Sequence, residues 1–192
     1  MKTIIAALLL VFGACAVAAG AAEQMETPKD MVLLTVGGEI ANTNRGPFDP
    51  QADSLFSRYK IDFERAFAFD RAMLLGLKQG SVTAQPNEFK QPVTFTGPLL
   101  KEVLAAVGAA RARLSVVAVN NYVGWLSPED IDSSDWILAL TADGKPLDIG
   151  QQGPLWLLNT REEGEKPSEY ARGHWVWAVM YLHVGDQAAE RQ

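Results

Sequence analysis

The sequence predicts a single α+β domain, in which several short strands form mixed sheets together with two or three short helices. Short runs of apolar and β-branched residues, many of them bounded by Gly, Pro, Asn or Asp, are typical of strands. Helical spacing of apolar residues is clear over residues 94–108 and weak elsewhere. The 192-residue chain is also long enough to bury one core without disulfide bonds.

The clearest predicted helix follows Gly97 and ends near Gly108. Pro98 suits the first helical position, where a missing N–H costs nothing, and Gly97 can act as the cap before it. Gly108 can adopt the left-handed conformation that ends a helix. One apolar stripe shows that the helix packs on a core, and it consists of Leu99, Leu100, Val103, Leu104 and Val107.

Residues 1–21 are predicted to be a signal peptide. Lys2 supplies the positive charge, residues 4–12 form a short apolar segment, and residues 19–21 are small, as a cleavage site requires. Residues 22–30 are then a connector, residues 31–185 the folded domain, and residues 186–192 a polar tail. We therefore expect a periplasmic or secreted protein. No apolar run in the sequence is long enough to be a membrane span.

Cys15 is the only cysteine and lies within this leader. Residues 12–15 faintly resemble a bacterial lipobox, in which Cys15 would become a lipidated N-terminus. Phe12 stands where an aliphatic residue is usual, so we favour the cleaved signal peptide over a lipoprotein. The mature chain would then have no cysteine and no disulfide bond.

The remaining elements are assigned in chain order. Asp70 is expected to cap a short helix over residues 71–77, and Ser127 with Pro128 to begin a single helical turn. Asp143 and Gly144 predict a tight turn. Strands are expected over residues 32–36, 61–69, 81–84, 93–96, 114–119, 122–126, 136–141, 154–158 and 174–184, with loops over residues 42–51 and 161–172.

Composition and motifs exclude several classes of function. The formal net charge of −6 argues against binding to nucleic acid or to anionic membranes. The sequence contains no Gly-x-Ser-x-Gly nucleophile motif, phosphate-binding loop or dinucleotide fingerprint. We therefore assign no catalytic residue.

His174 and His183, the only histidines, are nine residues apart on the predicted final strand. At that spacing they would point to opposite faces of a sheet, which argues against a shared metal site. No metal ligand is assigned.

A candidate ligand site is predicted at the ends of two strands. Asn120, Asn121 and Tyr122 follow the strand over residues 114–119, and Trp125 has Gly124 beside it to leave room for a ring. Arg172 and His174 precede the last strand. If these six residues converge, Arg172 would favour an anionic ligand. The alternative is that the Asn side chains only satisfy turn backbone.

Three segments together resemble a known family. Residues 94–104 are similar to its aromatic, glycine and apolar-pair helix opening, and residues 119–122 to its polar-polar-Tyr corner. Residues 143–147 and 153–157 resemble its two Gly-Pro-Leu motifs, and residues 175–177 its terminal aromatic strand. The family is the sulfite-oxidase-type molybdopterin-binding domain, in particular its small exported members, and the match spans about residues 32–184.

The resemblance implies a molybdopterin oxidoreductase fold, but the expected thiolate ligand of molybdenum is missing. In the family that cysteine precedes the central helix, and here the corresponding residues 79–91 contain no cysteine. Trp156 also stands where the family commonly has an arginine.

We therefore expect a non-redox binding module for a small, anionic ligand or for an exported protein partner such as a sensor domain. No cofactor is expected on this hypothesis. The alternative is a molybdopterin-dependent oxidoreductase without thiolate ligation.

Overall fold

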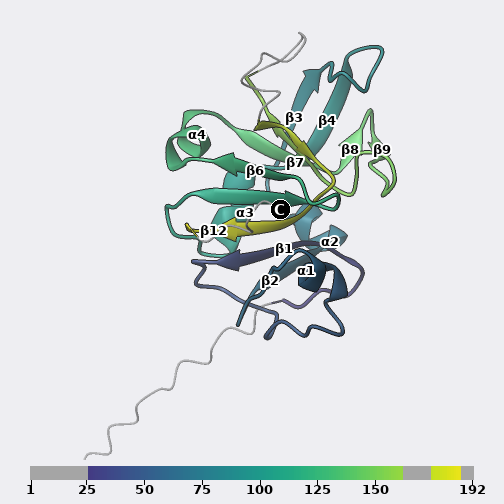
Figure 1. Cartoon of the computed structure of the whole chain (residues 1–192). Coiled ribbons are helices and arrows are strands. Elements are labelled where there is room, and N and C mark those ends of the chain that lie inside the picture. The colour runs from purple at the N-terminus through teal and green to yellow at the C-terminus, as the bar shows by residue number, and fades with distance from the viewer. Residues whose placement is uncertain (1–25, 162–173, 187–192) are drawn as a thin grey trace, which may run out of the picture.

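Three β-sheets and four short helices build the described part of the chain, residues 26–161 and 174–186 of this computed structural model (Figure 1). The fold is the mixed α+β single domain that the sequence predicts. The leader, the tail after residue 186 and most of the loop over residues 161–172 lie outside the described residues. No helix among the described residues is long and apolar enough to cross a membrane.

The largest sheet has five strands and contains both the first and the last strand of the chain. Its order is β2 (Phe67–Asp70), β1 (Val32–Gly38), β12 (Val179–Val184), β5 (Leu114–Ala118) and β6 (Val123–Leu126). β1 and β12 pair in parallel, and the other neighbours are antiparallel. The first and last strands therefore lie side by side at its centre.

Two smaller sheets pack near it. One has the order β11 (Val176–Trp177), β10 (Trp156–Asn159) and β7 (Trp136–Ala139). The other has the order β3 (Gln79–Ala84), β4 (Val93–Pro98), β8 (Thr141–Ala142) and β9 (Lys145–Pro146). β8 and β9 meet at the predicted turn, where Asp143 and Gly144 both have positive φ.

The helices are α1 (Ser54–Arg58), α2 (Arg71–Gly76), α3 (Leu100–Ala106) and α4 (Pro128–Ser133). Asp70 caps α2 by accepting a hydrogen bond from the Met73 N–H, as predicted. Ser127 caps α4 and forms a capping box with Asp130. α1 is an additional helix that the sequence pattern did not indicate.

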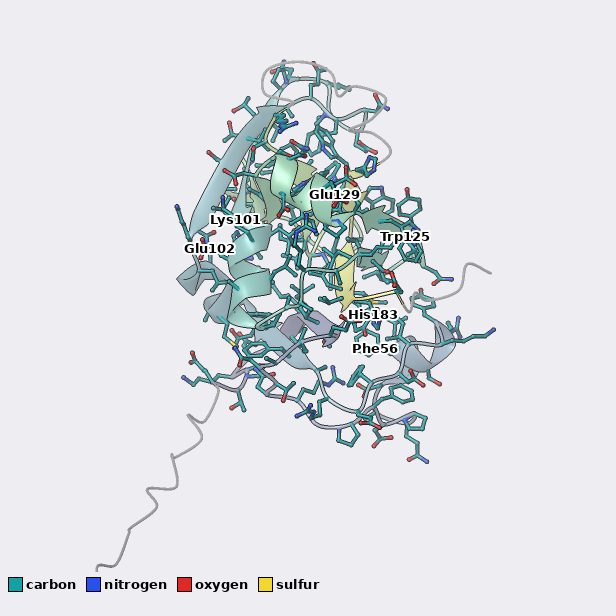
Figure 2. The ribbon with its side chains drawn as sticks, turned by 90° about the vertical axis from the view of Figure 1, so that its left-hand side faces the viewer. Phe56, Lys101, Glu102, Trp125, Glu129 and His183 are labelled. Atoms are coloured by element: carbon teal, nitrogen blue, oxygen red, sulfur yellow. The ribbon has the colours of Figure 1, made fainter. Side chains whose placement is uncertain are left out.

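Two hydrophobic clusters occupy opposite faces of the five-stranded sheet. The main core fills one face and includes residues of α3 and of all three sheets. The second cluster contains Val117, Val123 and Tyr181, with Phe56 of α1 and Trp125 packed against it. Figure 2 shows this division: Lys101 and Glu102 of α3 lie on one side of the view, and Trp125, His183 and Phe56 on the other.

The predicted start of the central helix is wrong. Gly97 and Pro98 belong to β4, and α3 begins at Leu100 after Leu99. A side chain at Gly97 would place its Cβ 2.0 Å from the Leu138 carbonyl oxygen. The glycine therefore serves the close approach of β4 to β7 rather than a helix cap. Gly108 does have a positive φ of 57° and follows the helix as predicted.

The predicted strand over residues 61–69 is also too long, because only Phe67–Asp70 pair in a sheet. The Ile61 N–H donates to the Phe56 carbonyl, and the Phe63 carbonyl accepts from Phe48 N. Helix α1 and the loop at Phe48 thus satisfy this backbone. The alternating pattern arises because Ile61 and Phe63 pack on the second cluster, not because the segment joins a sheet.

The predicted last strand, over residues 174–184, is broken in two. Ala178 has a positive φ of 54° and separates β11 from β12. His174 precedes both strands, so His174 and His183 do not share a strand as expected. The break turns Trp177 and its neighbours toward a different sheet from β12, which creates the site described next.

Candidate functional site

A cavity of about 330 Å³ opens beside β11. Four segments of the chain line it: the loop between β3 and β4, the turn between β5 and β6, the start of β10, and the chain around β11. Its volume is within the range of small-molecule sites. The lining residues are Pro86, Asn87, Glu88, Asn120, Tyr122, Trp156, Trp175, Val176 and Trp177.

The buried lining residues are Pro86, Trp156, Trp175 and Val176, and we call the last three the floor of the cavity. Trp156 is 2% exposed, and its ring contacts two phenylalanines. The ring centroids are 5.2 Å apart for Phe95 and 6.1 Å apart for Phe89. These contacts hold the indole in one position.

Two indole N–H groups of the floor have no hydrogen-bond partner within the described residues. They are Nε1 of Trp156 and Nε1 of Trp175, and Trp175 is only 8% exposed. A buried donor without a partner costs about 1–3 kcal/mol. Both nitrogen atoms are fully enclosed by protein atoms, so the two indoles contribute the apolar faces of their rings to the cavity and carry this cost in stability.

The rim carries exposed aromatic and amide side chains. Tyr122 is 48% exposed and Trp177 is 37% exposed. Asn120 Oδ1 accepts a hydrogen bond of 3.1 Å from the Tyr122 N–H. Asn87 and Glu88 are exposed on the opposing loop. The rim thus offers rings for stacking and polar groups for orientation.

Of the six residues predicted to converge, Asn120 and Tyr122 line this cavity. Asn121 does not line it. Its φ of 65° places it at the left-handed position of the turn, which is the role of the alternative interpretation for an Asn at a corner. Arg172 lies outside the described residues.

Trp125 does not converge with Tyr122, which corrects the expectation from its neighbour Gly124. Trp125 pairs with Ser115, which in turn pairs with His183, so the three side chains lie on the face toward α1. The Arg113 guanidinium stacks on its ring, 4.0 Å from the centroid. The space beside Gly124 is filled by Val176, whose Cγ2 would be 2.5 Å from an added Cβ.

His174 does not line the cavity either. Its ring centroid lies 6.4 Å from that of Trp136, on a different part of the three-stranded sheet. His183 is half-buried on the α1 side, with Nδ1 3.3 Å from the Tyr181 hydroxyl. Burial lowers the pKa of His183 and raises that of Tyr181. Within the described residues, no three His, Cys, Asp or Glu side chains are grouped to hold a metal ion.

The sequence interpretation missed the three tryptophans and the loop residues Asn87 and Glu88. Trp156 and Trp177 are directly paired across β10 and β11, but only the strand register reveals this. The aromatic pattern of residues 175–177 was the only sequence feature that pointed to them. It did not distinguish a binding site from a core, because buried tryptophans are usually core residues.

A larger cavity of about 470 Å³ lies against α1 and is mainly apolar. Its arginine, Arg45, forms an ion pair with Asp53 and stacks on Phe56 and Phe63. This cation is therefore already neutralised by a neighbouring carboxylate. The cavity beside β11 is therefore the better candidate.

Comparison with known proteins identifies the fold but no family membership. No family model matches the sequence, and no curated protein is similar to it. Among solved structures, the chain is similar to the sulfane dehydrogenase SoxCD from Paracoccus pantotrophus, with a TM-score of 0.55 and 18% identity. The match covers 88% of this chain and 41% of that chain. The likeness confirms the predicted sulfite-oxidase-like fold, while the chain spans less than half of its structural neighbour.

Proposed function

We propose that this protein is an exported binding module that holds a small ligand in the cavity beside β11 and performs no redox chemistry. The observation that carries the proposal is the nature of the cavity wall. Residues 79–91, to which the resemblance assigns the molybdenum ligand, contribute Pro86, Asn87 and Glu88 to that wall and no sulfur.

The residues present do not fit a molybdenum–thiolate centre. Amide and carboxylate oxygens are hard donors and do not replace a soft thiolate equivalently. Trp156 lies on the floor, where the resemblance expects an arginine for the pterin phosphate. An indole donates one neutral hydrogen bond and carries no charge to bind a phosphate. We therefore derive no reaction step through this cofactor.

A second candidate is a molybdopterin-dependent oxidoreductase with non-thiolate ligation. The fold favours it, since the likeness to the sulfane dehydrogenase extends over 88% of the chain. At 18% identity that likeness concerns the fold alone. The third candidate is an exported protein partner, such as a sensor domain. Tyr122 and Trp177 are both exposed on the cavity rim, where a partner could contact their rings.

The full chain purified from its native compartment tests the proposal. We expect no stoichiometric molybdenum by elemental analysis and a bound small molecule by native mass spectrometry. Tyr122→Ser should lose the bound mass, and Trp125→Phe, on the opposite face of the sheet, should retain it. Stoichiometric molybdenum would overturn the binding module in favour of the oxidoreductase. N-terminal sequencing of the same sample tests export, and a mature chain beginning at Cys15 would show a lipoprotein instead.

A further inference from the structure

We infer that the cavity beside β11 is a site for a small organic cation, of the class that carries a quaternary ammonium group. This names the ligand class of the proposed binding module, so it rests on the proposed function. Three features of the described lining carry it: four aromatic rings, one carboxylate without a balancing cation, and floor side chains that accept no hydrogen bond.

Four of the nine lining residues have aromatic rings. Trp156 and Trp175 contribute ring faces to the floor. Tyr122 and Trp177 stand on the rim, 48% and 37% exposed. The face of an aromatic ring carries partial negative charge, so it attracts a cation placed over it and repels an anion. Several rings around one cavity therefore favour a positively charged ligand.

The surrounding structure fixes where these rings stand. Asn120 Oδ1 accepts a hydrogen bond from the Tyr122 N–H, and Tyr122 Cε1 lies 3.7 Å from the position of a Cβ built on Gly124. Trp177 pairs in register with Trp156 across β11 and β10. Rings that are held in place before a ligand arrives lose little freedom when it binds, which favours specific recognition.

The charge of the described lining is negative. Glu88 is its only charged residue, and none of the ion pairs among the described residues includes Glu88. The neighbouring Phe89 holds this loop on the floor, because its ring centroid lies 6.1 Å from that of Trp156 and its N–H donates to the Pro86 carbonyl over 3.0 Å. A carboxylate at the rim attracts a cation and opposes an anion.

The anionic ligand that the sequence predicts depends on Arg172, which lies outside the described residues. The described lining contains no Lys or Arg to support an anion. A cation therefore suits this lining better than the ligand expected from the sequence.

The floor distinguishes a quaternary ammonium group from a primary one. The side chains of Trp156, Trp175 and Val176 accept no hydrogen bond, and both indole nitrogens are enclosed by protein atoms. A primary ammonium at this floor would lose the bonds that its three N–H donors make to water. A trimethylammonium group has no N–H to leave unpaired, and its methyl groups can contact the ring faces.

Choline is the probe for this assignment, with two matched compounds as controls. Neohexanol has the same shape but carbon in place of the charged nitrogen, and ethanolamine carries its charge on a primary ammonium. In calorimetric titration of the full chain, choline should bind about tenfold more tightly than neohexanol, given about two- to fivefold for each exposed ring. Ethanolamine should also bind more weakly than choline. The N-methyl proton resonance of bound choline should move upfield, as expected over a ring face.

Two variants of the rim test the ring and the carboxylate separately. Trp177→Leu removes an exposed ring and should weaken choline binding by about two- to fivefold, and Trp177→Phe should recover part of the loss. Glu88→Gln keeps the size of the side chain and should weaken binding by about two- to fivefold at low salt and by less in about 1 M salt. Glu64→Gln makes the same charge change on an exposed residue outside the cavity and should leave binding unchanged. The indole N–H resonance of Trp136, which is hydrogen-bonded away from the cavity, reports that each variant is folded.

Free choline and the headgroup of a choline lipid share this chemistry, and vesicles of phosphatidylcholine distinguish the two sources. Cosedimentation that Trp177→Leu abolishes would assign the site to the lipid headgroup. Absence of cosedimentation would assign it to a free compound.

Three results would overturn the assignment. If neohexanol binds as tightly as choline, the cavity recognises shape and not charge. If choline does not bind at concentrations up to tens of millimolar, the ligand is not an organic cation of this class. If Trp177→Leu and Glu88→Gln both bind choline as the wild type does, these groups do not hold it. Native mass spectrometry decides the proposed function separately, because a bound mass that Tyr122→Ser loses would keep the binding module with another class of ligand.

Discussion

The two ends of the three-stranded sheet each bury a tryptophan, but only one of these indoles has a hydrogen-bond partner for its N–H. At what we call the closed end, Trp136 of β7 pairs with Asn159 of β10. At the cavity end, Trp156 of β10 pairs with Trp177 of β11. Trp136 and Trp156 are each 2% exposed, so burial alone does not distinguish them. The difference lies in their N–H groups.

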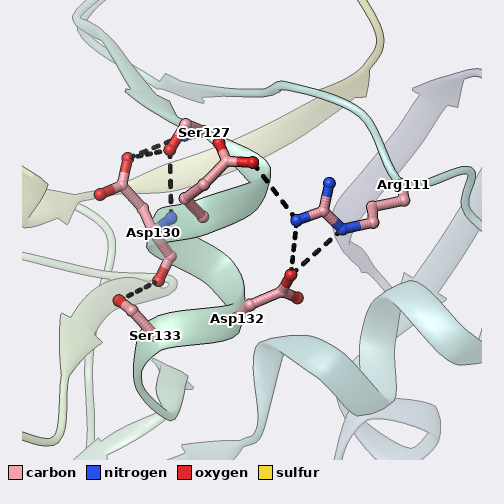
Figure 3. A network of polar contacts seen from close by, with 6 residues as sticks. Arg111, Ser127, Asp130, Asp132 and Ser133 are labelled. Carbon is pink, nitrogen blue, oxygen red and sulfur yellow. Dashed lines mark hydrogen bonds and ion pairs between the residues drawn. The ribbon is translucent and has the colours of Figure 1, made fainter.

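At the closed end, the side-chain N–H groups of Trp136 and Asn159 both have hydrogen-bond partners. Trp136 Nε1 donates to the Asp130 carbonyl of α4, and Asn159 Nδ2 donates to Ser134 Oγ over 2.9 Å. Figure 3 shows how α4 is held: Ser127 and Asp130 bond each other at its start, and Arg111 bonds Asp132.

At the cavity end the matching donors have no partner within the described residues. The two ends are parts of one sheet, so the difference is not one of fold. It means that the closed end combines burial with a satisfied hydrogen bond, while the cavity end leaves buried donors unsatisfied at a cost in stability. Four substitutions or titrations test this contrast, from the largest expected effect to the smallest.

The largest effect is expected from removing the satisfied N–H. Trp136→Phe deletes one of the two donors to the Asp130 carbonyl, which keeps the hydrogen bond from Ser133 Oγ, so the lost bond costs about 0.5–1.5 kcal/mol. Trp156→Phe loses a similar ring volume but no hydrogen bond. We expect Trp136→Phe to lower the free energy of unfolding by about 0.5–1.5 kcal/mol more than Trp156→Phe, measured by urea denaturation. Equal losses would remove the contrast between the ends.

The closed end was largely predictable from sequence, and the cavity end was not. Ser127 and Pro128 mark the start of α4 by local rules, because a cap depends on residues three apart. The apolar run over residues 136–141 similarly predicts β7, although the structure ends that strand at Ala139 and places Thr141 in β8. Local patterns of this kind also gave the cap at Asp70 and the turn at Asp143 and Gly144.

The cavity depends on contacts between residues distant in sequence. Its wall joins Asn87, Asn120 and Trp177, and nothing local relates these three positions. The break at Ala178 requires a positive φ at a residue that does not favour it, so the sequence predicts one continuous strand instead. Trp125 was misplaced for the same reason: the face that a strand residue occupies depends on register, which is set by partner strands.

The cap of α4 should give the next largest effect. Ser127→Ala removes the side chain that accepts from the Asp130 N–H, and we expect a loss of about 1 kcal/mol in the free energy of unfolding. Ser127→Thr should retain most of the stability, because threonine is also a good cap and its hydroxyl can still donate to the Asp130 carboxylate. The small molecule that native mass spectrometry detects should be retained in both variants. Its loss would show that the two ends are coupled.

His183, on the α1 side of the five-stranded sheet, allows a test by pH, because the cavity floor has no titratable group among the described residues. Burial lowers the pKa of His183 below its ordinary value of 6.5, with Glu39 and Asp62 opposing the shift. Between these two pKa values the unfolded chain binds a proton that the folded chain does not. The free energy of unfolding should therefore fall as the pH drops below about 6.5 and level off below the folded pKa.

His183→Gln should remove this part of the pH dependence in urea denaturation at a series of pH values. The floor of the cavity has no titratable side chain among the described residues, so the Trp156→Phe variant should keep the wild-type pH profile. A flattened profile in Trp156→Phe instead would mean that protonation at His183 is linked to the cavity end.

The smallest effect is expected at the charged surface of the closed end. Arg111 Nη2 lies 2.8 Å from Asp132 Oδ2 and 3.3 Å from Glu129 Oε1, but all three side chains are exposed. Water and salt screen such pairs, and holding long side chains in one geometry opposes the attraction. Arg111→Gln should therefore shift the urea midpoint less than Ser127→Ala does. In about 1 M salt, where the screening length is about 3 Å, the remaining shift should vanish. If Arg111→Gln instead destabilised the protein as much as Ser127→Ala, surface charge rather than buried hydrogen bonding would hold α4 against Trp136.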